Sequence, residues 1–232
     1  VVVDGDDIPD VAVPIGPGTT IRGRVEVEGA SVNATPVGPL RLVTWRAAFG
    51  MLPGGTVEVD VPPDLTFTLA GIHGRQQLRV MELPDGWWVK SITIEGRDAL
   101  AGYDFPRRGT LDNVVVLVSA RPSGVTGRVE GTPDALRGAV VAAIPDDSTD
   151  SPEDIDVRTQ LRPLHADGSF ALRGLRPGRY MIAALAVGAM DARRDQTREE
   201  QGEFLRSVGT AIDVSEGRVE TATLRLVDVP AP

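Results

Sequence analysis

Residues 167–180 read DGSFALRGLRPGRY, and this stretch decides the fold because its spacing describes two strands joined by a bend. Phe170 and Leu172 alternate along the first strand, so both side chains point to the same inner face. Gly174 permits a backbone conformation closed to other residues. Pro177 and Gly178 suit the central positions of a type II turn, where glycine supplies φ > 0. The stretch therefore predicts two strands joined by a tight bend, and Tyr180 at its end begins the second strand.

Two parts of the chain repeat at nearly the same interval. The sequence FALRGL at 170–175 has a counterpart, FTLAGI, at 67–72, which is 103 residues earlier. The sequence GRVE occurs at 23–26 and again at 127–130, 104 residues later. This period is too long for a solenoid repeat and suits tandem copies of one β-sandwich. We therefore expect a first module at 19–120 and a second at 121–232.

The first seven residues resemble a segment late in the first module. Residues 1–7 (VVVDGDD) resemble residues 92–98 (ITIEGRD), which lie late in the first module. We therefore interpret 1–18 as a closing strand or linker from a preceding module. If so, the parent protein is an array. The chain also lacks an initiator methionine, which suggests a processed protein or an excerpt from a longer one.

The predicted elements are short strands, with one short helix near 197–207. Alternating apolar residues separated by glycine and proline turns indicate strands. The expected ranges are 20–28, 40–46, 56–61, 66–70, 77–82, 87–94, 111–119, 124–130, 139–145, 161–165, 169–173, 179–186, 211–214 and 221–226. The helix has Thr197 as its expected N-cap and Glu200 as the partner in a capping box.

The pattern F-x-L-x-G-L-x-P-G-x-Y at 170–180 resembles the signature of carboxypeptidase regulatory-like domains. That family belongs to the transthyretin-like Greek-key sandwiches, together with collagen-adhesin B-type repeats. The resemblance implies an all-β fold of tandem transthyretin-like sandwiches. It implies no peptidase activity, because the module is only an accessory to some zinc carboxypeptidases. The first module departs from the pattern: it has His73, Gly74 and Arg75 where the second has the Pro-Gly turn.

Composition excludes several classes of function. The formal net charge is -9, so the chain lacks the basic footprint of a nucleic-acid binder. It contains no cysteine, which excludes disulfides, thiolate catalysis and cysteine-ligated zinc. No apolar run approaches the 18 or so residues that membrane insertion needs.

We expect no enzyme activity, no catalytic residues and no cofactor-binding residues. The two histidines, His73 and His165, have no zinc-ligand spacing, and neither a nucleophile elbow nor a phosphate loop is present. The sequence leaves open one alternative, a pair of carboxylates that hydrolyses glycosides.

Two acidic clusters could bind calcium through carboxylate oxygens. The first is Asp4, Asp6, Asp7 and Asp10, and the second lies within 146–156. A solvated loop is the commoner explanation for both.

Three tryptophans are candidates for a ligand platform: Trp87, Trp88 and Trp45. Trp87 and Trp88 are adjacent, so in a strand they face opposite sides, and one of them could stack on a sugar ring. Core packing is the plainer alternative. We predict a structural or protein-binding module of a larger exported bacterial protein, at the cell surface or in the periplasm, with neighbouring domains or other proteins as partners. The alternative is a carbohydrate-binding module.

Overall fold

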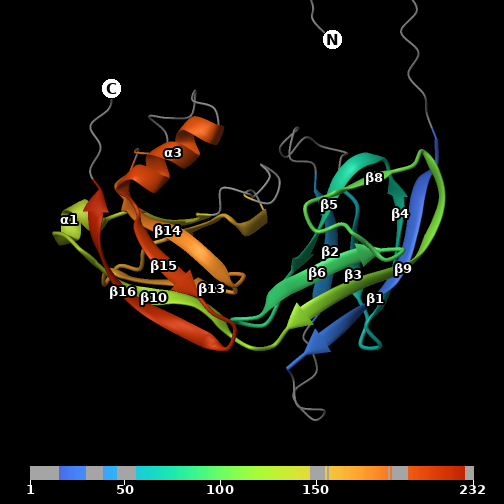
Figure 1. Cartoon of the computed structure of the whole chain (residues 1–232), viewed down its shortest axis with the longest axis horizontal. Coiled ribbons are helices and arrows are strands. Elements are labelled where there is room, and N and C mark those ends of the chain that lie inside the picture. Colours follow the sequence, from blue (N-terminus) through green and yellow to red (C-terminus); the bar gives the residue numbers. More distant parts are fainter. Residues whose placement is uncertain are drawn as a thin grey trace, which may run out of the picture.

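The computed structural model describes residues 16–29, 39–45, 56–146, 155, 157–187, 189 and 198–227. Within them the chain is all-β, as predicted, and has two helices, of four and 11 residues. Strands β1–β9 form one half and β10–β16 form the other (Figure 1). The strands of the N-terminal half are β1 (Gly18–Glu28), β2 (Leu40–Trp45), β3 (Glu58–Val61), β4 (Thr66–Ile72), β5 (Gly74–Met81), β6 (Trp88–Ile94), β7 (Arg97–Asp98), β8 (Tyr103–Phe105) and β9 (Arg108–Ser119).

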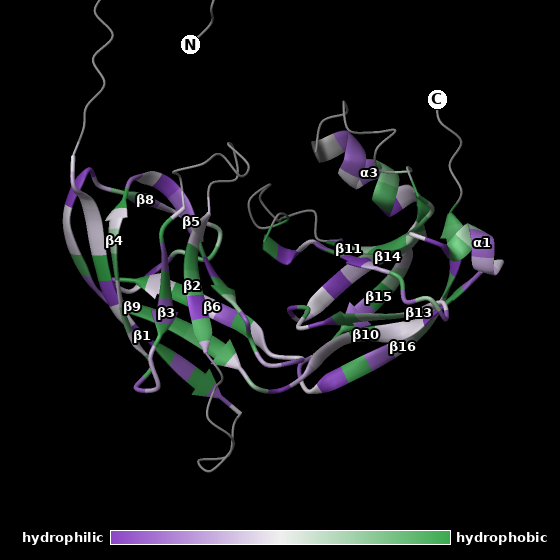
Figure 2. Cartoon of the chain, turned by 180° about the vertical axis from the view of Figure 1, so that it is seen from behind, coloured by the Kyte–Doolittle hydropathy of each residue, from purple (hydrophilic) through white to green (hydrophobic). Residues whose placement is uncertain are grey.

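In the N-terminal half two sheets enclose one core. The first sheet has the order β4-β1-β9-β6-β7, and the second has the order β3-β2-β5-β8. Alternate residues of the strands face inward, so hydrophobic and hydrophilic residues alternate along them (Figure 2). Ile21, Leu69 and Val116 are among the core residues that are at most 1% exposed.

The C-terminal half is a single connected sheet of seven strands. Its strands are β10 (Ser123–Glu130), β11 (Val140–Pro145), β12 (Gln160–Pro163), β13 (Ser169–Arg173), β14 (Gly178–Leu185), β15 (Thr210–Val214) and β16 (Arg218–Val227). The order is β12-β11-β14-β16-β10-β13, and β15 pairs with β14. Residues of β11 and β14 are buried on both faces, because one face meets the core and the other meets helix α3 (Arg198–Val208), whose Leu205 is buried there.

The register of the sheets explains the sequence repeat. β1 lies parallel to β9 and antiparallel to β4, and Gly23 is aligned with both Val114 and Phe67. β10 lies parallel to β16 and antiparallel to β13, and there Gly127 is aligned with both Ala222 and Phe170. Each glycine thus leaves room for a phenylalanine ring and for the carbonyl of the parallel strand. Any larger residue would have to displace one of them.

The predicted helix is present as α3, although its expected cap Thr197 lies outside the described residues. The sequence patterns missed α1 (Pro133–Leu136) and the short strands β7 and β8, which have two and three residues. Elements this short contain too few residues to show a period. α1 nevertheless has a readable start, because Thr132 caps it and proline follows.

The bend in the diagnostic stretch differs from the predicted type II turn. Gly178 has φ +146 and is already paired with Val214 as the first residue of β14. A type II turn needs φ near +80 at that position, and here the strand begins too early to allow it. The left-handed residue of the bend is Gly174, with φ +67.

Neither described helix, of four and 11 residues, has the length and hydropathy needed to span a bilayer.

Candidate functional site at the junction of the two halves

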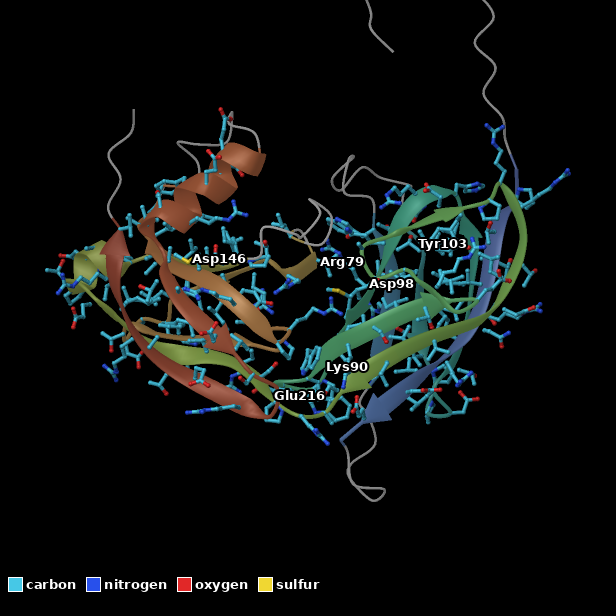
Figure 3. The ribbon with its side chains drawn as sticks, in the orientation of Figure 1. Arg79, Lys90, Asp98, Tyr103, Asp146 and Glu216 are labelled. Atoms are coloured by element: carbon cyan, nitrogen blue, oxygen red, sulfur yellow. The ribbon has the colours of Figure 1, made fainter. Side chains whose placement is uncertain are left out.

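Side chains from both halves meet where the chain passes from β9 to β10. The connection is only three residues long, Ala120-Arg121-Pro122. Figure 3 shows Lys90 of the N-terminal half next to Glu216 of the C-terminal half at this point. We call the contacts across this connection the junction.

The charged part of the junction is centred on Lys90, which is the only lysine of the chain. Its Nζ lies 2.6 Å from Glu28 Oε2 and 3.7 Å from Glu216 Oε2. Glu216 also accepts a 2.8 Å hydrogen bond from Ser119 Oγ through its other oxygen. The hydrogen bond to Lys90 lowers the pKa of Glu28, and the same bond raises the pKa of Lys90. One ammonium group therefore joins a carboxylate from each half.

Arg176 supplies a second link, from the loop between β13 and β14. Its guanidinium donates to the carbonyl oxygen of Val89 at 2.9 Å and to that of Lys90 at 2.5 Å. These carbonyls are available because β6 bulges: Val89 and Ser91 pair with consecutive residues of β9, and Lys90 is the extra residue. The fixed fork of an arginine side chain suits two adjacent acceptors.

The same loop packs closely on the N-terminal half. The backbone N–H of Gly174 donates to the carbonyl of Ser123 at 2.8 Å, which ties the loop to the start of β10. A Cβ at Gly174 would overlap the carbonyl oxygen of Trp87. The diagnostic glycine therefore serves both its own bend and the approach of the two halves.

The three tryptophans occupy different surroundings. Trp88 is 5% exposed, and its indole N–H donates to the carbonyl of Arg121 at 3.2 Å, so it anchors the connection and offers no open ring face. Trp87 is half-buried against the N-terminal core. Trp45, at the end of β2, is also half-buried, and the guanidinium carbon of Arg79 lies 4.8 Å from its ring centroid. The platform hypothesis for Trp87 and Trp45 stays a prediction.

Almost all of the proposed calcium ligands lie outside the described residues, and the calcium site stays a prediction. Asp4, Asp6, Asp7 and Asp10 lie outside them, as does the second acidic cluster except for Asp146. Asp146 pairs with Arg179 at 3.5 Å. The described part of the chain contains no group of three acidic, histidine or cysteine residues placed to hold a metal ion. His73 is half-buried between β4 and β5, and His165 is exposed in the connection between β12 and β13.

Sequence reasoning missed Arg176, Glu28, Lys90 and Glu216 as a group. Two signals were nevertheless present: Lys90 is the single lysine, and Arg176 stands inside the diagnostic stretch where the first module has His73. The arrangement neutralises its charges internally and satisfies backbone carbonyls across the connection. It can hold two sheets at a set angle, and it presents no nucleophile-base pair.

No family model matches the chain, and no curated protein matches it. Among solved structures, it is similar to the TIE protein of Bacillus anthracis, with 8% identity and a TM-score of 0.31 over 91% of this chain and 34% of that one. A streptococcal ancillary pilin gives 14% identity and 0.29 over 89% of this chain and 62% of that one. The minor pilin of Streptococcus agalactiae gives 10% and 0.31, over 92% of this chain and 98% of that one. The chain thus spans less than two thirds of the first two proteins, and likeness at this level assigns no family.

Proposed function

We propose that the chain is a non-catalytic spacer of two β-sandwich domains, 19–120 and 121–232, held at a fixed angle within a larger exported bacterial protein. The resemblance of the diagnostic stretch to carboxypeptidase regulatory-like domains supports an accessory role. The partners are then neighbouring domains of the same chain or other proteins.

The double hydrogen bond of Arg176 carries this proposal. A hydrogen bond that crosses the junction resists rotation of one half against the other only if both of its ends belong to rigid elements. Val89 and Lys90 lie in β6, which is paired with β9, and Arg176 follows β13, which is paired with β10. The three-residue connection is too short to let the halves move far apart, and the indole N–H of Trp88 donates to the carbonyl of Arg121 within it. A flexible linker would instead leave these donors and acceptors to water.

The test is the distribution of distances between the halves in solution. The chain has no cysteine, so Thr68→Cys on β4 and Thr210→Cys on β15, both exposed, allow spin labels to be placed on each half alone. Double electron-electron resonance should give one narrow distance peak for the otherwise unchanged chain. Arg176→Ala should broaden it, because the loop loses both bonds to β6.

Arg179→Ala is the matched control. Arg179 lies three residues further along the same chain segment, is exposed, and pairs within its own half with Asp146. Its removal should leave the distance peak unchanged. A broad peak before any junction substitution, or a peak that stays narrow in Arg176→Ala, would show that the junction does not set the angle.

A further inference from the structure

One strand of the C-terminal half has an uncovered edge. β16 pairs with β10 from Arg218 to Arg225, but its other edge meets β14 only at Leu226 and Val227. No strand among the described residues pairs with the outer edge of 218–225, and Figure 2 shows β16 at the rim of this half. An unpaired edge exposes backbone donors and acceptors that can pair with another strand.

In the N-terminal half, the equivalent edge is paired with another strand. Gly23 is aligned with Val114, and its counterpart Gly127 is aligned with Ala222, so 114–116 of β9 correspond to 222–224 of β16. In the N-terminal half this edge is covered: β6 runs antiparallel to β9 and places residues 92–94 opposite 114–116. The C-terminal half inserts helix α3 at this point of its strand order, and α3 packs elsewhere.

Burial differs between the two edges as this comparison requires. Val115 of β9, which pairs with β6, is half-buried, whereas its counterpart Thr223 is exposed. Val114 is fully buried, whereas its counterpart Ala222 is only half-buried. Leu224 is already buried, and a strand added at this edge would cover Ala222 and Thr223 and complete the sheet on the pattern of the N-terminal half.

The sequence at 1–7 matches the strand that occupies the equivalent edge. VVVDGDD corresponds position by position to ITIEGRD at 92–98, which forms the end of β6, a two-residue turn at Glu95 and Gly96, and β7. Arg218 and Arg225 of this strand already pair with Glu220 at 3.0 Å and Glu130 at 3.7 Å, so the match depends on the residue pattern and not on charge.

We infer that the free edge of β16 binds residues 1–7 of a second copy of the chain, as an antiparallel strand with Val1, Val2 and Val3 opposite Leu224, Thr223 and Ala222. A second copy is favoured over the same molecule by reach. In the same molecule, Asp7 would lie opposite Arg218 at the junction, and the 11 residue steps from Asp7 to Gly18 span at most about 40 Å. β1 alone, which runs from Gly18 to the junction, is about 33 Å long, so the segment could reach its own β16 only when almost fully extended. The inference is independent of the spacer function.

Disulfide trapping of the predicted register provides the test, because the chain has no cysteine of its own. Val2→Cys and Thr223→Cys are made in separate full-length chains, mixed, and oxidised. Directly opposed residues of antiparallel strands have Cα atoms about 4.5–5.5 Å apart, which suits a disulfide. The matched control pairs Val2→Cys with Arg225→Cys, on the same face of β16 but two residues out of register, at about 7–8 Å.

A heterodimer should form from the Thr223→Cys mixture on the order of tenfold faster than from the Arg225→Cys mixture. The absence of a heterodimer, or equal rates for the two mixtures, would overturn the inference. A chain carrying both Val2→Cys and Thr223→Cys that closes on itself at high dilution, as a monomer, would also overturn it.

Discussion

Replacing Gly127 with alanine should destabilise the C-terminal half, although glycine-to-alanine changes in strands usually stabilise. An alanine Cβ at 127 would overlap the carbonyl oxygen of Ala222 and lie 3.0 Å from Phe170 Cε1. The oxygen belongs to the backbone of the parallel strand β16, so it cannot turn aside as a flexible side chain could. The substitution therefore forces β10 and β16 apart or displaces the phenylalanine.

The expected size follows from two opposing effects. Alanine in place of glycine normally contributes about 0.5–1 kcal/mol, because the unfolded chain loses less freedom. Overpacking of a rigid site costs about 1–3 kcal/mol, and a backbone clash belongs at the upper end. The net expectation is a loss of about 2 kcal/mol in the free energy of unfolding, which is a factor of about 30 in the folded-to-unfolded ratio.

Urea denaturation followed by circular dichroism measures this loss. Tryptophan fluorescence reports the unfolding of the N-terminal half separately, because Trp45, Trp87 and Trp88 all lie there. Gly202→Ala in α3 is the matched control. Its Cβ would meet only the flexible end of Arg206, at 3.4 Å, so alanine should stabilise by about 1 kcal/mol. If Gly127→Ala raised stability as Gly202→Ala does, the close parallel packing inferred from the repeated glycines would be refuted.

Three other substitutions or conditions test the junction. Trp88→Ala should cost about 3–5 kcal/mol in urea denaturation, because a buried ring and the bond to Arg121 are both lost; a cost below about 1 kcal/mol would contradict the burial. Gly174→Ala should broaden the spin-label distance distribution as Arg176→Ala does, since its Cβ would push against Trp87; an unchanged distribution would show that the loop does not control the approach. The Glu28–Lys90 pair should stabilise the chain at neutral pH. Glu28, with its lowered pKa, loses this contribution as the pH falls through that pKa, and Lys90, with its raised pKa, loses it as the pH rises through its own. Relative to Glu28→Gln, the unchanged chain should therefore lose stability at both extremes in pH-dependent melts, and parallel pH curves for the two chains would argue against the pair.

The sequence predicted the strands well, because alternation along a half-buried sheet leaves a direct trace in the residue order. The diagnostic stretch at 167–180 was informative for the same reason, since Phe170 and Leu172 are buried and Gly174 takes a left-handed conformation. The junction left no such trace. Arg176 contacts β6 some 86 residues away in sequence, and its partners are backbone carbonyls, which every residue has. A contact to a bulged backbone cannot be read from residue types.

The difference between the two halves comes from one insertion. Both halves share the strands β1–β5, β8 and β9 in the first and β10–β16 in the second, and each inserts a segment between its fifth and sixth shared strands. The N-terminal half inserts the β6–β7 hairpin, which covers the edge of β9 and also carries Trp88, Val89 and Lys90 to the junction. The C-terminal half inserts α3, which packs on the outer face of β11 and β14, and among the described residues no strand pairs with the outer edge of 218–225 in β16. The same hairpin thus covers the edge of one sheet and supplies the carbonyl oxygens that Arg176 binds across the junction, so a single insertion accounts for both differences between the halves.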